Sequence, residues 1–258
     1  MKVRIPLYAA ASGLLFLAGL PQLLPAQPIT VPNFSFEQQT APATYPYVNI
    51  NVDEWQKAPE PAYYTPAFGG YGIPWVGTAG VFLDVNPYAN HVGNQCGYIL
   101  AVPQATLFQD YTSTPTHDFN ATYDVGKSYT LTVGVFGKTS VAPGSTFQLS
   151  LYYLDGSSNH VVVEATTITY SAAAFPTNLP LNLMDFSVNV PTVQAGDAWA
   201  GQHIGIQLES TIPIELTSFG NWDFDNVRLT TSVPEPASAS LLALGLGSWL
   251  FRRTRPRR

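Results

Sequence analysis

The sequence predicts an all-β protein built as a β-sandwich of the jelly-roll type. Residues 129–136 and 147–154 alternate apolar and polar side chains with the period of two that is typical of strands. Glycine, proline and asparagine turns separate many such short segments, and no amphipathic helix stands out between residues 30 and 230. Many short strands at regular spacing favour a sandwich over other all-β folds.

The remaining strands follow from the same pattern. Five further segments are predicted as strands: 161–164, 167–170, 184–190, 204–209 and 224–230. The turn sequence at 155–159 predicts a hairpin between the strands on either side of it. Residues 142–145, Ala-Pro-Gly-Ser, are expected to join their neighbouring strands in the same way.

The stretch from residue 40 to residue 90 has a different composition. It is rich in proline, glycine and aromatic residues and has few β-branched alternations. We expect long irregular loops over one edge or face of the sandwich, and binding sites often lie on such loops.

The N-terminal segment, residues 1–26, is predicted to be a signal peptide. Lys2 and Arg4 precede an apolar run at 5–24, and cleavage near Ala26 fits the usual layout. The protein is therefore expected to be exported.

The C-terminal segment, residues 233–258, resembles the PEP-CTERM sorting signal of Gram-negative bacteria. An apolar run at 241–251 and an arginine-rich end at 252–258 follow a short motif, and the motif consists of Val233, Pro234, Glu235 and Pro236. The resemblance implies recognition by an exosortase, cleavage at the motif, and delivery to the cell surface or extracellular matrix. Residues 237–251 are short for a permanent span, which needs roughly 20 apolar residues, so we expect a transient transmembrane helix in the inner membrane. An uncleaved single-span anchor is the alternative.

Residues 27–232 form the predicted sandwich domain, and their charge limits its partners. Four basic residues remain there against 16 acidic ones, a net charge of −12, compared with −6 for the whole chain. Such a surface repels phosphate backbones, so we expect no nucleic-acid partner. It favours divalent cations and neutral ligands such as polysaccharide.

Four short motifs in order resemble the galactose-binding-like jelly rolls, which include several carbohydrate-binding modules. They are Asn-Phe-Ser-Phe-Glu at 33–37, Phe-Gln-Asp-Tyr at 108–111, Lys-Ser-Tyr-Thr-Leu-Thr-Val at 127–133, and Asp-Phe-Asp-Asn-Val-Arg-Leu at 223–229. The resemblance implies a structural calcium ion that ties the first strand to the last through Glu37 and Asp225. Strand alternation adds that Asp225 shares a face with Val227 and Leu229. An inward-facing carboxylate there needs a cation or several hydrogen bonds. The alternatives are a hydrogen-bonded Asp225 that caps a turn, or a bulge that turns Asp225 to solvent.

The sequence favours a non-catalytic glycan-binding or scaffolding domain. Aromatic rings stack on sugar faces, and the expected ligand-binding residues on the loops are Tyr63, Tyr64, Tyr71 and Trp75. The alternative is a calcium-dependent jelly-roll enzyme, either cyclase-like or glycan-cleaving. Its acids could come from Asp110, Asp118, Asp223 and His91, but their spacing does not require convergence, so no catalytic residue is assigned.

Overall fold

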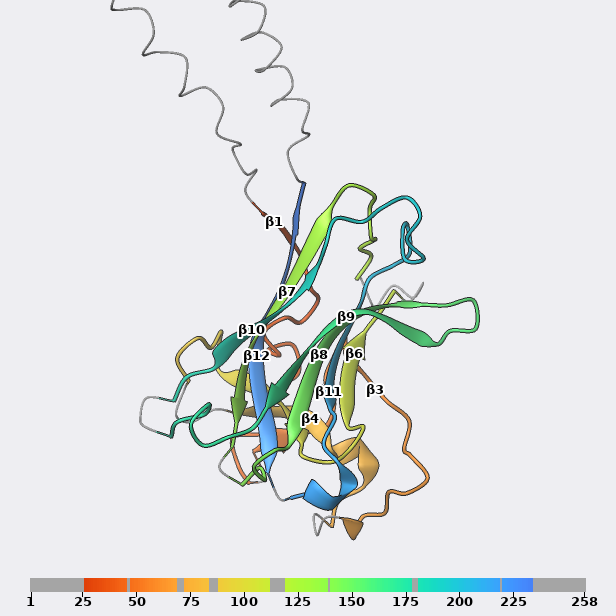
Figure 1. The fold of residues 1–258 in the computed structure, drawn as a ribbon. Helices are drawn as coiled ribbons and strands as arrows, with labels where there is room; N and C mark the ends of the chain where they lie inside the picture. The colour runs from red at the N-terminus through yellow and green to blue at the C-terminus, as the bar shows by residue number, and fades with distance from the viewer. Residues whose placement is uncertain are drawn as a thin grey trace, which may run out of the picture. The chain divides into compact units, whose positions relative to one another are not determined.

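Two antiparallel β-sheets form a sandwich in the computed structural model of the protein (Figure 1). The structure describes residues 26–45, 47–68, 72–83, 88–111, 119–138, 140–177, 181–218 and 220–233, and the compact unit is Ala26–Ser232. The predicted all-β sandwich is confirmed. The predicted signal peptide (apart from Ala26) and the sorting segment (apart from Val233) lie outside the described residues. In the part of the chain that is described, no helix has the length and apolar character needed to cross a membrane.

The first sheet carries the cavity discussed below. Its strands, in spatial order, are β10 (Met184–Val190), β7 (Ser128–Gly137), β12 (Asn221–Ser232), β5 (Gln95–Leu100), β4 (Ala79–Leu83) and β2 (Val48–Asn49), and β1 (Gln27–Ile29) pairs with the far end of β12.

The second sheet has five strands. In spatial order they are β3 (Gln56–Lys57), β6 (Thr106–Gln109), β11 (Gly205–Ser210), β8 (Thr146–Leu154) and β9 (His160–Thr169). Figure 1 shows β6, β11 and β8 side by side. Two short 3-10 helices lie in the connections, η2 (Trp75–Gly77) and η3 (Ile214–Leu216).

Aromatic stacking between the sheets fills the core. The ring of Phe147 on β8 stacks on Trp222 at 5.4 Å and on Phe224 at 5.9 Å, both on β12. Phe224 also meets Phe36 edge-on at 5.2 Å. Because Trp222 and Phe224 face inward, Asp223 between them points to the outer face of the first sheet.

The predicted strands with regular alternation are confirmed, and two details are corrected. The hairpin over residues 155–159 joins β8 and β9 as expected, but 161–164 and 167–170 belong to one strand, β9, that carries an irregularity in its pairing with β8. Residues 142–145 do not close a hairpin. They cross from β7 in the first sheet to β8 in the second, since a Pro-Gly turn also serves a corner between layers.

A bulge in β12 overturns the alternation argument for Asp225. The pairing of β12 with β7 shifts between Asp225 and Arg228, and Asn226 adopts a left-handed φ of 56°. The extra residue reverses the parity, so Phe224 and Val227 both reach the core while Asp225 does not share their face. Asp225 is nevertheless fully buried, under the loop that precedes β5.

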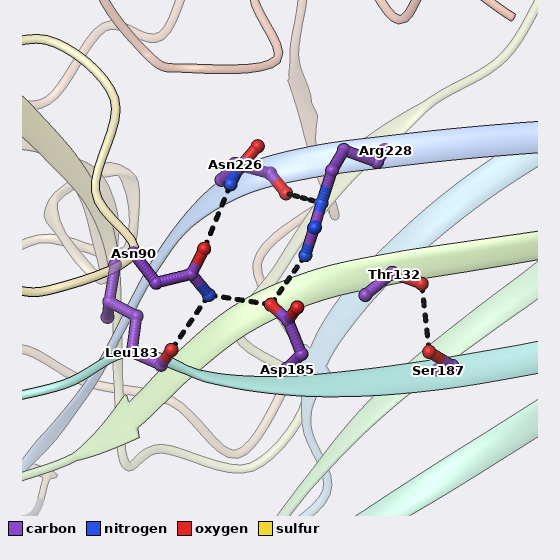
Figure 2. Close-up of polar contacts among 7 residues, drawn as sticks. All are labelled: Asn90, Thr132, Leu183, Asp185, Ser187, Asn226 and Arg228. Atoms are coloured by element: carbon purple, nitrogen blue, oxygen red, sulfur yellow. Dashed lines mark hydrogen bonds and ion pairs between the residues drawn. The ribbon is translucent and has the colours of Figure 1, made fainter. Parts of the chain in front are cut away.

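Polar contacts fix this bulge from the outer side (Figure 2). Asn90 accepts a hydrogen bond from the Asn226 side chain at 3.1 Å and donates to the Leu183 carbonyl at 2.8 Å. The Asp185 carboxylate on β10 accepts a hydrogen bond from the Asn90 amide at 2.6 Å and forms an ion pair with Arg228 at 2.5 Å. The loop before β5, the strand β10 and the bulge are therefore held as one unit.

Candidate functional site

A cavity of about 540 Å³ opens on the outer face of the first sheet. Its floor comes from β2, β4, β5 and β12, and its wall from the loop around η2. The residues that line it are Tyr47, Val48, Ile50, Ile73, Pro74, Gly77, Phe82, Tyr98, Leu100, Lys138, Asn221 and Asp223. This lining is mostly apolar and aromatic, with few polar groups, as in sites for small organic ligands.

Strand register brings the polar groups of the cavity together. Asp223 on β12 lies directly opposite Tyr98 on β5, and Asn221 lies opposite Leu100. Lys138 follows the last residue of β7, and its amide donates to the Asn221 carbonyl at 3.1 Å. Three segments far apart in the sequence thus meet at one end of the sheet.

Asp223 is the centre of this group. Its side chain is fully buried, and its Oδ2 accepts a hydrogen bond from the Tyr88 hydroxyl at 2.5 Å. The Lys138 ammonium lies 2.9 Å from the same oxygen, and Asn221 donates to Oδ1. An adjacent cation and several donors favour the ionised carboxylate. The cavity floor therefore holds a buried carboxylate that is paired with an ammonium.

The Lys138 ammonium also faces aromatic rings. It lies 5.4 Å from the ring centre of Phe82 and 5.6 Å from that of Tyr88. Such contacts stabilise a cation that has left bulk water. Its side chain keeps 36 % of its surface exposed, whereas Asp223 is at 0 %.

Tyr98 supplies an uncharged aromatic wall. Burial raises the pKa of its phenol to about 12, and the hydroxyl donates to the Gly77 carbonyl at 3.2 Å. Gly80 on the neighbouring strand makes room for this ring, because a Cβ there would lie 2.8 Å from the Tyr98 ring and 2.5 Å from the Asn49 carbonyl oxygen.

Lys57 ties the loops that form the cavity wall. Its ammonium donates to the carbonyls of Val76 at 2.5 Å and Ala79 at 2.6 Å, and also to that of Ile50. Burial lowers the pKa of Lys57 to about 8. The same side chain therefore holds both sides of the loop region that the sequence shows as irregular.

The aromatic residues predicted to bind a ligand pack the loop behind this wall. Tyr64 and Trp75 are buried, meet edge-on at 5.0 Å, and donate to the carbonyls of Ile73 and Ala58. Tyr63 packs on Phe68 and donates to the Pro103 carbonyl. Tyr71 lies outside the described residues. The described three support the loop rather than form an exposed row of rings.

Glu37 and Asp225, the predicted metal ligands, both bind the loop that precedes β5 at one corner of the sandwich. Glu37 Oε1 accepts the amides of Asn94 and Gln95, both at 2.7 Å. Asp225 Oδ2 accepts the amide of Val92 at 2.6 Å, so both carboxylates cap the same short loop before β5. The amide of Val227 bonds the Phe34 carbonyl at 2.9 Å, which joins the opening turn to the bulge in β12.

The electrostatics of this corner fit a cation. Burial, together with a smaller effect of the Glu37 charge, raises the pKa of Asp225 to about 7, although the amides of Val92 and Asn226 act to lower it. The other oxygen of Asp225, Oδ1, is buried and accepts no hydrogen bond from the described residues. Ligand atoms of His91 and Cys96 and one carboxylate oxygen of Asp225 lie within 4.8 Å of one another.

The other acids considered from the sequence do not join the cavity. Asp110 lies on the second sheet, where it accepts hydrogen bonds from Tyr152 and Gln56. His91 belongs to the Asp225 corner, and Asp118 lies outside the described residues. Of the three described residues, only Asp223 lines the cavity. Lys138 was not predicted as a site residue. In the sequence it stands out only as one of the four basic residues of the domain.

Comparison with known proteins identifies the family of this domain. The family model HpiC1-like, described as HpiC1 cyclase, matches residues 27–230. A search of curated proteins finds no match.

Solved structures show the same fold. The Stig cyclase Fisc from Fischerella sp. TAU, in complex with (3Z)-3-(1-methyl-2-pyrrolidinylidene)-3H-indole, is 24 % identical with a TM-score of 0.51. The match covers 82 % of this chain and all of that one. A second structure of a cyclase from Fischerella sp. TAU is 22 % identical with the same TM-score and the same coverage. Xylan-binding CBM22 modules are also found, for example one from Paenibacillus barcinonensis at 11 % identity over 70 % of this chain and 87 % of that one, with a TM-score of 0.38, a likeness too low to bear on function.

The family match overturns the prediction of a non-catalytic glycan-binding or scaffolding domain. That prediction was wrong because the jelly roll hosts unrelated activities, and short motifs shared by the fold do not distinguish them. The match instead favours the cyclase-like alternative and extends over the whole predicted sandwich. The chain belongs to the HpiC1-like cyclase family.

Proposed function

We propose that the protein is a cyclase that closes a ring in an unsaturated aromatic substrate within the cavity on the first sheet. The observation that carries this proposal is the Asp223–Lys138 ion pair, set at 2.9 Å in a lining that is otherwise mostly apolar and aromatic. The family match gives the reaction class. The indole compound in the Fischerella structure gives the ring system to test first.

The geometry supports ring closure through a positively charged transition state. The Asp223 carboxylate is held by Tyr88, Asn221 and Lys138, so it need not reorganise as charge develops on the substrate. The rings of Phe82 and Tyr98 present π faces that stabilise a cation. The mostly apolar lining offers few polar groups that could hold a water molecule to trap the cation before the ring closes. Asp223 therefore stabilises charge, and the aromatic walls fold and shield the chain.

Binding of an indole tests the site. We expect (3Z)-3-(1-methyl-2-pyrrolidinylidene)-3H-indole to bind the protein in calorimetric titration, and Leu100→Trp to abolish binding by filling the cavity. Leu154→Trp is the matched control, since Leu154 also ends a strand and is half-buried but lies away from this cavity. Binding that survives Leu100→Trp would place the ligand elsewhere.

Calcium at the Glu37–Asp225 corner is the second part of the proposal. Calcium prefers six to eight oxygen ligands from carboxylates and carbonyls. The buried Oδ1 of Asp225, and the Glu37 carboxylate on the same loop, offer oxygen ligands of that kind. The thiol of Cys96 and the imidazole of His91 suit zinc better, so zinc should be titrated in parallel. A bound calcium ion would hold the opening turn against the bulge of β12 and so steady the strand that carries Asp223.

We also propose export and sorting, as the terminal segments predict. Val233–Pro236 would be recognised by an exosortase at the inner membrane, and the domain would reach the cell surface or extracellular matrix. This proposal rests on the sequence resemblance. Fractionation of cells with and without the exosortase, followed by blotting for the domain, tests it, and an unchanged distribution would contradict it.

A further inference from the structure

We infer that Lys138 selects substrates that carry a hydrogen-bond acceptor, such as a carboxylate or a carbonyl, on the aromatic skeleton. This inference rests on the proposed function, because it assigns a specificity to the same cavity. Lys138 is the only lysine or arginine among the described residues that line the cavity. Its position and its hydrogen-bond capacity carry the argument.

The backbone of Lys138 fixes where its ammonium can reach. Its amide is bonded to Asn221 on the adjacent strand, two residues from Asp223. The side chain then runs past the rings of Phe82 and Tyr88 to the Asp223 carboxylate. A lysine at this point lies at the edge of the cavity floor rather than in bulk solvent.

The ammonium keeps donors for a ligand. A lysine has three N–H groups, and among the described residues the Lys138 ammonium forms an ion pair with Asp223 alone. Its side chain is 36 % exposed at the cavity. The Asp223 carboxylate is fully buried, accepts hydrogen bonds from Tyr88 and Asn221, and pairs with Lys138. The ammonium, rather than the carboxylate, therefore presents an open hydrogen-bonding group to a substrate.

The mostly apolar surroundings of the Lys138 ammonium make the cavity selective for ligands with an acceptor. An acceptor bound to the ammonium in a site that excludes water gains more than it would in solvent. A substrate without an acceptor leaves the remaining N–H groups desolvated and unsatisfied, which is costly. The cavity should therefore discriminate between ligands of equal size that differ only in this one group.

Three indoles of similar size make the test. Indole-3-acetate carries an anionic acceptor, indole-3-acetamide carries a neutral acceptor, and 3-ethylindole carries none. We expect calorimetric titration of the protein to give the order acetate, acetamide, ethylindole, with at least a tenfold tighter Kd for the acetate than for the ethyl compound. Lys138→Met should remove this preference, while Lys138→Arg should keep most of it.

Matched variants separate selectivity from loss of structure. Lys127→Met removes a lysine that pairs with Asp124 at 2.8 Å outside the cavity, and it should keep the wild-type preference. Because Lys138→Met leaves Asp223 without its cation, the double variant Lys138→Met with Asp223→Asn should restore thermal stability and still lack the preference.

Each contrary result has its own meaning. Equal binding of the three indoles by the wild-type protein, or an unchanged preference in Lys138→Met, would overturn the inference and leave the proposed function in place. Binding of none of the three would overturn it together with the proposed aromatic substrate.

Discussion

Charged residues are few in this domain, and those described beside the cavity have identifiable tasks. Asp223 and Lys138 neutralise each other beneath an apolar cavity, and Lys57 joins three loop carbonyls beside it. Burial of a charge is costly unless it is paired and hydrogen-bonded. These pairings explain how the fold tolerates charge where its apolar surface would otherwise exclude it.

Asp223→Asn should lower the rate of ring closure on the order of 10²-fold, because the substitution removes the fixed negative charge near the developing cation. The amide is isosteric, so indole binding should change by only a few fold. Single-turnover kinetics with an alkenyl indole measures the rate. Asp124→Asn, which breaks the exposed pair with Lys127, is the control and should turn over normally. A normal rate in Asp223→Asn would remove Asp223 from the reaction.

Lys57 should impose a pH dependence on stability. Its pKa is about 8 in the folded protein and 10.5 ordinarily, so between these values the unfolded chain holds a proton that the folded protein has lost. The free energy of unfolding therefore rises as the pH increases from about 8 to about 10.5. Urea denaturation of the wild type and Lys57→Met at pH 7 and pH 10 measures this. The two proteins should differ in slope, and parallel pH profiles would show that Lys57 does not titrate in this way.

The register between neighbouring strands brings the residues of the site together. Asp223 and Tyr98 face each other across β12 and β5, and Gly80 on β4 opens space for the Tyr98 ring. Asp223 and Asp225 both precede the bulge at Asn226; Asp223 lines the cavity, while Asp225 lies at the Glu37 corner. One strand thereby serves both sites.

Gly80→Ala should test this arrangement. The added Cβ meets a backbone carbonyl and the Tyr98 ring, so β2 or Tyr98 must move. We expect a loss of about 1–3 kcal/mol in the free energy of unfolding and weaker indole binding. Gly156→Ala in the turn between β8 and β9 is the control, since open space surrounds it, and it should stay within about 0.5 kcal/mol. Equal effects of the two substitutions would contradict the role assigned to Gly80.

The long regular strands could be predicted from the sequence, and the cavity could not. Residues 129–136, 147–154 and 184–190 carry clean alternation because one face of each meets the core. In β5 nearly every residue is buried, since the loops and η2 cover its outer face as well, so no alternation marks its register. Asp223 was only one of several candidate acids, and Lys138 lies 85 positions away from it. Their pairing depends on which strands become neighbours, which no local pattern encodes.

For the whole molecule, the Glu37–Asp225 corner connects the opening turn, the loop before β5 and the last strand. A cation there would join segments from both ends of the domain. Stability should then depend on that cation, because a ligand that binds only the folded state raises its midpoint of unfolding.

Calcium should raise the Tm of the purified protein, and a chelator should lower it. Asp225→Asn and Glu37→Gln should abolish the response, while Glu164→Gln, at an exposed position of β9, should retain it. Differential scanning calorimetry measures the shift. A response to zinc that is lost in Cys96→Ala, with none to calcium, would replace calcium by a softer metal at this corner.

The proposed activity is ring closure of a substrate in the cavity above Asp223. Incubation of the protein with indoles bearing an alkenyl side chain, followed by mass spectrometry and NMR of the products, tests it most directly. We expect the wild type to form a product of unchanged mass with one ring more and one double bond fewer. The Leu100→Trp variant should not form this product. Recovery of every substrate unchanged from a protein that binds it, or equal turnover by Leu100→Trp, would contradict the claim.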